Sequence, residues 1–150
     1  MDPQPHHSDA TLATSRLIPA TPRQIFAAFE RPDHLARWWG PDGFTNTFER
    51  FEFKPGGRWT FVMHGPDGTN YPNENIFREI LPDSKIVIEH ILDPLFKLTV
   101  ELTACGDQTH LAWHQVFETP EVAARVRSIC EPANEQNLDR LEAVLAAEIS

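Results

Sequence analysis

The segment that decides the fold is residues 119–147, TPEVAARVRSICEPANEQNLDRLEAVLAA, which contains no glycine. Its apolar residues recur at helical spacing, at Val122, Val126, Ile129, Cys130, Ala133, Leu138, Leu141, Val144 and Leu145. Thr119 followed by Pro120 is typical of a helix start. These residues at 1.5 Å each make a helix of about 43 Å, whereas a domain of 150 residues has a radius of gyration of only about 15 Å. We therefore expect this helix to cross the whole molecule.

Pro132 lies in the middle of this predicted helix. A proline there removes one backbone hydrogen bond and clashes with the preceding turn, which costs about 3 kcal/mol or more. We expect a kink near residues 128–132 or a break into two segments. The kink would let the helix follow a curved sheet, and it would also widen a cavity beneath Ile129, Cys130 and Ala133.

Amide side chains interrupt the apolar stripe just beyond Pro132. Helical spacing puts Asn137, and also Asn134, on the inner side of the helix. A buried amide without a partner costs about 1–3 kcal/mol. We therefore expect strand side chains, a water molecule or a ligand to bond these two amides.

Six short segments with alternating polar and apolar residues precede the helix, and turn signals separate them. They are residues 45–53, 58–64, 70–80, 85–91, 96–105 and 108–117. Short turns between consecutive strands predict an antiparallel meander, and residues 9–20 read as a strand that completes the sheet as a seventh. Because an apolar sheet face must cover something, we expect the sheet to curl around the long helix.

Two short helices are predicted between the first and second strands. Residues 21–30 begin with Thr21 as N-cap, Pro22 at the first helical position and Gln24 in a capping box. Residues 32–39 form the second helix, which a Gly-Pro-Asp-Gly turn ends. The predicted fold class is α+β, with a seven-stranded antiparallel curved sheet wrapped around a long C-terminal helix.

The composition is that of one globular domain. The chain has 13 Lys and Arg against 22 Asp and Glu, a net charge of −9. This balance argues against nucleic acid or an anionic membrane as the main partner, because both need a basic surface.

We expect a flexible leader over residues 1–8, whose two adjacent histidines are incidental, and one domain over residues 9–150. No signal peptide or apolar run of about 20 residues is present. We therefore expect a cytoplasmic protein, with Cys105 and Cys130 reduced.

The adjacent residues Trp38 and Trp39 point to an internal pocket. Neighbouring residues on a helix point about 100° apart, so one core cannot easily take both rings. We expect one ring to plug the core against Leu35 and Phe26 and the other to line or cover a cavity mouth; alternatively, both pack with Phe44. A lining of aromatic residues with a few polar groups suits a hydrophobic small molecule. The predicted pocket residues are Trp38, Trp39, Phe51, Trp59, Phe61, Met63, Phe77, His90, Phe96, Trp113, Cys130, Asn134 and Asn137.

His90 is the candidate for acid–base chemistry, because the alternation of its strand puts it on the inward face. A carboxylate beside it inside an apolar cavity would permit isomerase or cyclase chemistry. Glu49 shares its predicted face with Phe51. For Glu74, the sequence does not decide whether its side of the strand faces inward or outward. The alternative is that both carboxylates are solvated. No His, Cys, Asp or Glu group has metal-ligand spacing, so we expect no metal and no cofactor.

Four stretches together resemble one known family: ATPRQIFAAF (residues 20–29), WWGPDGF (38–44), FKPGGRWTFVMHGPDG (53–68) and EPANEQNLDRLEAVLA (131–146). The family is that of proteins homologous to the activator of heat-shock-protein ATPase. It belongs to the START-like (SRPBCC) superfamily, which also holds polyketide cyclases and birch-pollen-allergen-like proteins. The resemblance implies a helix-grip fold. It also implies binding of apolar small molecules between sheet and helix, as in single-domain members of the superfamily.

Three functional hypotheses follow. The first is binding of a small hydrophobic or aromatic ligand between the sheet and the C-terminal helix, without dedicated catalytic machinery, by a monomer or homodimer. The second is a protein-interaction module, of a co-chaperone or stress-response type, that binds a chaperone or another protein partner. The third is a cyclase or isomerase that uses His90 with a nearby carboxylate.

Overall fold

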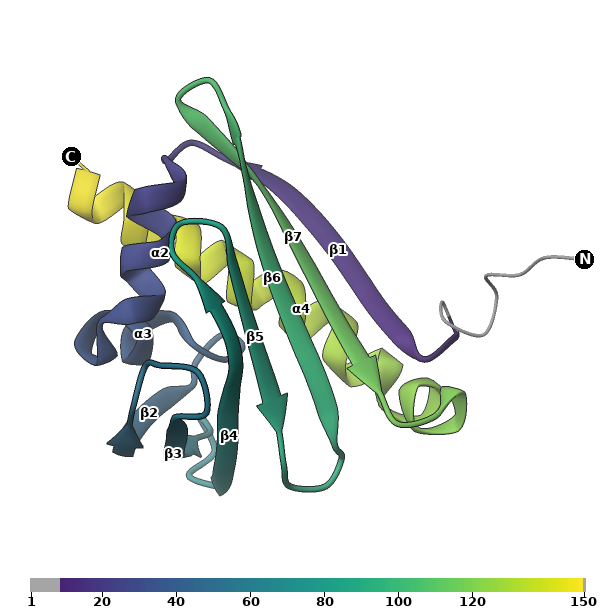
Figure 1. Cartoon of the computed structure of the whole chain (residues 1–150). Helices are drawn as coiled ribbons and strands as arrows, with labels where there is room; N and C mark the ends of the chain where they lie inside the picture. The colour runs from purple at the N-terminus through teal and green to yellow at the C-terminus, as the bar shows by residue number, and fades with distance from the viewer. Residues whose placement is uncertain (1–8, 150) are drawn as a thin grey trace, which may run out of the picture.

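The computed structural model describes residues 9–149 (Figure 1), so the predicted leader over residues 1–8 lies outside the described residues. The described part forms a seven-stranded antiparallel sheet in the order β1-β7-β6-β5-β4-β3-β2. The strands are β1 (Thr11–Ile18), β2 (Thr45–Phe51), β3 (Arg58–His64), β4 (Asn70–Leu81), β5 (Lys85–His90), β6 (Phe96–Cys105) and β7 (Gln108–Phe117). The helices are α2 (Pro22–Glu30), α3 (Pro32–Trp38) and α4 (Pro120–Ile149). The meander is confirmed, and β1 completes the sheet by pairing with the last strand, β7.

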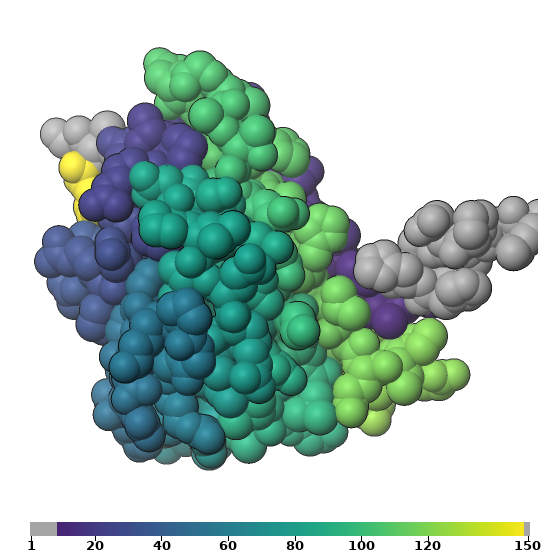
Figure 2. Space-filling view, viewed as in Figure 1, coloured from purple at the N-terminus to yellow at the C-terminus, as the bar shows by residue number. Residues whose placement is uncertain are grey.

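Helix α4 lies on one face of the sheet and runs diagonally across it (Figure 1). In the same orientation with all atoms drawn, the sheet hides most of α4 and leaves its ends visible (Figure 2). Thr119 Oγ1 accepts a hydrogen bond from the Val122 amide at 3.1 Å, which confirms the predicted helix start. The helix is continuous through Pro132, so the predicted alternative of a break is wrong. Pro132 and Ser128 are both exposed, so water can bond the Ser128 carbonyl that the proline leaves without a partner.

Arg16 fastens β1 to the middle of α4. Its Nη1 donates to Asp139 Oδ1 at 2.7 Å and to Glu142 Oε2 at 2.9 Å, and its Nη2 donates to Glu135 Oε1 at 2.8 Å. Positions three, four and seven residues apart share one face of a helix. One guanidinium therefore holds three carboxylates, and α4 keeps a fixed position along β1.

Aromatic rings fill the half of the sheet–helix space that lies next to α2 and α3. Trp59 is fully buried, and its ring stacks on those of Phe61 and Phe77 at centroid distances of 4.5 and 5.8 Å. We call this group the aromatic cluster; it comprises Trp38, Phe48, Phe51, Trp59, Phe61 and Phe77. Offset and edge contacts between rings add about 0.5–1.5 kcal/mol per pair to the burial of their area. This half of the fold is therefore a solid core.

A β-bulge in β2 changes which side chains join the aromatic cluster. The register of β2 against β3 shifts between Phe48 and Arg50. Phe48 and Phe51 consequently lie on the same side, with ring centroids 5.7 Å apart, and Glu49 is exposed. The expectation that Glu49 shares the inward face of Phe51 is wrong, because the extra residue of a bulge interrupts the two-residue alternation.

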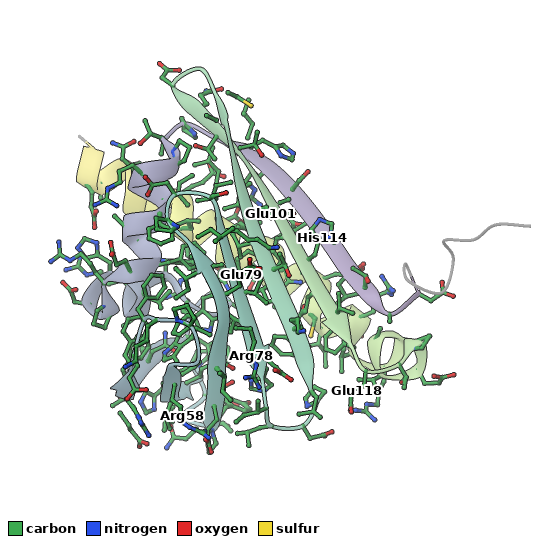
Figure 3. All side chains as sticks on the ribbon, in the orientation of Figure 1. Arg58, Arg78, Glu79, Glu101, His114 and Glu118 are labelled. Atoms are coloured by element: carbon green, nitrogen blue, oxygen red, sulfur yellow. The ribbon has the colours of Figure 1, made fainter. Side chains whose placement is uncertain are left out.

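The face of the sheet away from α4 carries charged and polar side chains. Figure 3 labels several on the strands, among them Arg58, Arg78, Glu79, Glu101 and His114. Arg78 pairs with Glu89 at 2.6 Å, and Lys85 pairs with Glu79 at 3.0 Å. Mixed charges of this kind are typical of a solvated face. In the described part of the chain, no helix has both the length and the apolar character that crossing a membrane requires.

Candidate functional site

A cavity of about 570 Å³ lies between the middle of α4 and the sheet, next to the aromatic cluster. Trp39 forms the boundary, because it lines the cavity and its ring centroid lies 5.0 Å from that of Trp59. Tyr71, Asp93 and Ile129 line the cavity and are exposed, so they mark its mouth. The sheet–helix space is therefore solid at one end and hollow at the other.

Eight of the predicted pocket residues line this cavity: Trp39, Met63, His90, Phe96, Trp113, Cys130, Asn134 and Asn137. The other five do not: Trp38, Phe51, Trp59, Phe61 and Phe77. These five point inward as expected, but they belong to the filled core. Phe51, Trp59, Phe61 and Phe77 are joined by ring contacts, and the Trp38 ring packs on Phe29 and Trp39. Periodicity predicts which side chains face the interior, whereas the contacts between them decide which part of that interior is filled.

Several lining residues were missed by the sequence prediction. Gly40, Pro41 and Phe44 come from the loop after α3, and Pro72 and Asn73 come from the start of β4. Nothing in their local pattern indicates a cavity, because they reach it only through the packing of this loop and β4 against the rest of the fold. Gln115 carried a usable signal, since it shares a face with the predicted residue Trp113. Ala133 and Ile129 line the cavity where the sequence predicts one, beneath the helix.

The two tryptophans divide between core and cavity. Trp38 is fully buried, and its Nε1 donates to the Ala28 carbonyl at 3.1 Å. Helix α3 ends at Trp38, and Trp39 has an extended backbone with φ −71° and ψ 130°. The end of the helix, rather than helical spacing, sends the Trp39 ring to the cavity wall. Of the two expectations, one ring in the core and the other on the wall is the arrangement found.

Arg140 on α4 holds the loop that lines one side of the cavity. Its Nη1 donates to the carbonyls of Trp39, Gly40 and Pro41 at 3.3, 2.9 and 2.9 Å. Its Nη2 donates to the carbonyls of Arg37 and Phe44 at 2.8 and 2.9 Å. The planar guanidinium can serve several acceptors at once. Residues 37–44 are therefore bound to α4 through their own backbone.

The amides beyond Pro132 bind protein partners. Asn137 Oδ1 accepts from the Gly40 amide at 3.2 Å, and Asn134 Nδ2 donates to Gln115 Oε1 at 3.0 Å. Gly40 has φ +100°, and a Cβ atom there would lie 2.6 Å from Met63 Cε. Only glycine fits this close approach without displacement of a neighbour. Of the expected partners, these amides use a strand side chain and the loop backbone.

His90 faces the cavity and has an amide partner rather than a carboxylate. The residue is 7% exposed, its Nδ1 lies 2.8 Å from Asn75 Oδ1, and its ring stacks on Phe96 at a centroid distance of 4.7 Å. Burial lowers the pKa of His90. Asn75 and Phe77 are buried on the inward side of β4, so Glu74 lies on the other side and pairs with Arg58 at 3.4 Å. The expected carboxylate beside His90 is therefore supplied by neither Glu49 nor Glu74.

Comparison with known proteins shows what this architecture is related to. Residues 19–146 match the pattern of the family described as Activator of Hsp90 ATPase homolog 1-like protein. The chain belongs to that family. No curated protein matches the chain.

The chain is also similar to solved structures. A crystal structure from Nitrosomonas europaea has 18% identity and a TM-score of 0.86, covering 94% of this chain and 97% of that chain. A solution structure from Arthrobacter aurescens has 24% identity and a TM-score of 0.87, covering 93% and 88%. A crystal structure from Rhodobacter sphaeroides has 26% identity and a TM-score of 0.82, covering 93% of each chain. These likenesses confirm the START-like, helix-grip fold.

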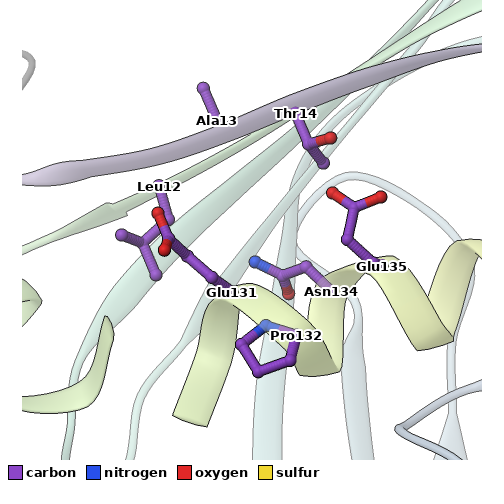
Figure 4. A pocket seen from close by; sticks show the side chains of 7 residues that line it. All are labelled: Leu12, Ala13, Thr14, Glu131, Pro132, Asn134 and Glu135. Carbon is purple, nitrogen blue, oxygen red and sulfur yellow. The ribbon is translucent and has the colours of Figure 1, made fainter. Parts of the chain in front are cut away.

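A second hollow in this family member, of about 300 Å³, lies between β1 and α4 (Figure 4). Glu131 and Glu135 lie on its wall, on either side of Pro132. Both carboxylates already have partners, since Glu135 pairs with Arg16 at 2.8 Å and Glu131 pairs with Arg127 at 2.8 Å. Within residues 9–149, no group of three or more His, Cys, Asp or Glu side chains is placed to hold a metal ion. We assign no function to this hollow.

The stability of this protein should depend on pH through His90. Because burial lowers the pKa of His90 in the folded chain, the unfolded chain binds a proton more readily below the ordinary value of about 6.5. His90 therefore destabilises the fold as pH falls. We expect His90→Gln to lose less free energy of unfolding than the wild type between pH 7.5 and 5, measured by urea denaturation.

His110 provides the control for His90, because it is exposed in the folded chain whereas His90 is buried. His110→Gln should change stability with pH as the wild type does. A His90→Gln variant that also follows the wild-type profile would contradict the prediction.

Proposed function

We propose that this protein binds a small apolar or aromatic molecule in the cavity between the sheet and α4. The observation that carries the proposal is the cavity of about 570 Å³ beside a solid aromatic cluster. Small-molecule sites are commonly concavities of about 300–1,000 Å³ with mostly apolar walls and a few polar groups. Here the apolar walls include Trp39, Phe96 and Trp113, and the polar groups include His90 and Asn137. Of the thirteen pocket residues that the sequence predicts, the proposal keeps the eight that line the cavity.

Native mass spectrometry of protein purified under mild conditions tests the proposal first. We expect a stoichiometric adduct, or, after exchange into buffer, a rise in melting temperature with an added aromatic ligand. A ligand at 100 times its dissociation constant stabilises the folded state by about 2.7 kcal/mol. An unliganded mass together with no shift across a broad ligand screen would contradict ligand binding.

Filling the cavity should abolish this binding without unfolding the protein. Ala133 lines the cavity from α4 and is half-buried, so we expect Ala133→Phe to place its ring in the space that the ligand uses. The ligand-induced shift in melting temperature should disappear, and circular dichroism should remain that of the wild type.

Ala124→Phe is the matched control, because Ala124 lies on an exposed part of the same helix and does not line the cavity. The control should keep the full ligand-induced shift. Equal binding by both variants would show that the ligand occupies another place.

A protein partner is the second candidate, and the exposed apolar side chains at the cavity mouth favour it. Ile129 is 70% exposed and Tyr71 is 44% exposed. Single exposed apolar residues are normal, but neighbours around one opening indicate a contact surface. Stimulation of the ATPase of a purified Hsp90-type chaperone, lost in Ile129→Glu, would support this candidate; no stimulation would remove it.

A further inference from the structure

The charges around the cavity restrict the kind of molecule that fits it. Among the lining residues that the structure describes, no lysine, arginine or glutamate is present. Asp93 is the one carboxylate, and it is exposed at the mouth. The walls deeper than the mouth therefore carry no permanently charged side chain.

Neither His90 nor Arg140 offers a cationic hydrogen-bond donor to the cavity. Burial lowers the pKa of His90, which keeps its ring neutral at pH 7. Arg140 lies against the loop, and both of its terminal nitrogens donate to backbone carbonyls of that loop. A carboxylate or an ammonium ion deep inside this space would lose its water without forming a direct ion pair with a wall side chain. Such desolvation costs several kcal/mol per ion in proteins.

Uncharged hydrogen-bonding groups, in contrast, are present on three walls. His90, Gln115 and Asn137 line the cavity and are 7%, 7% and 6% exposed. Within residues 9–149, their protein hydrogen bonds use His90 Nδ1, Gln115 Oε1 and Asn137 Oδ1. A neutral ring that donates from Nδ1 keeps Nε2 as an acceptor, and amide nitrogens are donors. These remaining atoms suit the carbonyl and hydroxyl oxygens of a neutral molecule.

We propose that the cavity selects uncharged aromatic molecules over carboxylates and ammonium ions with the same body. This inference rests on the proposed function, because it names the class of ligand for that same site. The selection comes from the absence of a counter-charge on the walls, and the neutral amides and His90 accept a polar but uncharged group.

Three probes with one aromatic body test the inference by isothermal titration calorimetry at pH 7. They are methyl 6-hydroxy-2-naphthoate, the anion 6-hydroxy-2-naphthoate and the cation (6-hydroxynaphthalen-2-yl)methylammonium. We expect the ester to bind at least tenfold more tightly than either ion. Binding of either ion as tight as that of the ester overturns the charge selection and leaves the proposed function standing. No binding by any of the three overturns both.

A lysine on the cavity wall should weaken the preference for the ester over the anion. Ala133→Lys places an ammonium group on the wall formed by α4, whereas Ala124→Lys places the same charge on an exposed part of that helix. We expect the ratio of ester to anion affinity to fall at least tenfold in Ala133→Lys and to stay at the wild-type value in Ala124→Lys. An unchanged ratio in Ala133→Lys, with the variant folded by circular dichroism, overturns the inference.

Discussion

Phe61→Ala is expected to lower the free energy of unfolding by about 3–5 kcal/mol, the usual cost of replacing a buried phenylalanine by alanine. Phe61 is 1% exposed and stacks on Trp59 at a centroid distance of 4.5 Å. The surrounding rings of the aromatic cluster are held by further ring contacts, so they cannot collapse into the space that the side chain leaves. Urea denaturation measures the loss, and in a domain of this size each kcal/mol lowers the melting temperature by about 2–4 °C.

Phe96→Ala is the matched control, because it removes the same atoms from the hollow half of the fold. Phe96 is half-buried and already borders the cavity on one side. Because its ring is less buried and the space beside it is already open, its replacement should cost about 1–2 kcal/mol, less than a full core truncation. Equal losses for the two variants would contradict the division into a solid half and a hollow half.

Arg140→Met is expected to lower the free energy of unfolding by about 2–3 kcal/mol. A hydrogen bond to a charged group contributes about 1.5–3 kcal/mol. Water partly reaches the carbonyls that Arg140 binds and can replace some of these bonds, so the total loss is smaller than the sum over all of them. Methionine keeps the apolar stem of the side chain. The segment that Arg140 holds, residues 37–44, should also open more often. Hydrogen exchange at the Gly40 and Asp42 amides, which donate to Asn137 Oδ1 and Gln136 Oε1, measures that opening.

Two further variants separate the role of Arg140 from that of its charge. Arg140→Lys keeps the charge but replaces the planar fork by a point charge with three donors, so it should recover only part of the lost stability. Arg37→Met removes a positive charge from an exposed side chain of the same segment, while the Arg37 carbonyl that Arg140 binds is kept, and it should change stability by less than about 0.5 kcal/mol. Full recovery in Arg140→Lys would contradict the role of the guanidinium fork.

The paired tryptophans show how far local pattern reaches. Adjacent aromatic residues at the end of a short helix predict that the two rings serve different surroundings, and they do. Which ring reaches the cavity depends on the residue at which α3 ends and on the hold of Arg140 over the following loop. The second feature depends on α4, which lies about a hundred residues further along the chain. No window of neighbouring residues contains that information.

The amino-acid sequence by itself determined the elements of this protein, because alternation and helical spacing are local consequences of backbone geometry. The first strand as a seventh member of the sheet, the helix starts at Thr21 and Thr119 and the inward direction of His90 all follow from such patterns, whereas the place of β1 beside β7 comes from the structure. Only the tertiary structure decided three other features: the outward position of Glu49, the split of the aromatic side chains between cluster and cavity, and Asn75 as the partner of His90. Each depends on contacts between strands or on a bulge that shifts their register, and long-range packing sets these contacts.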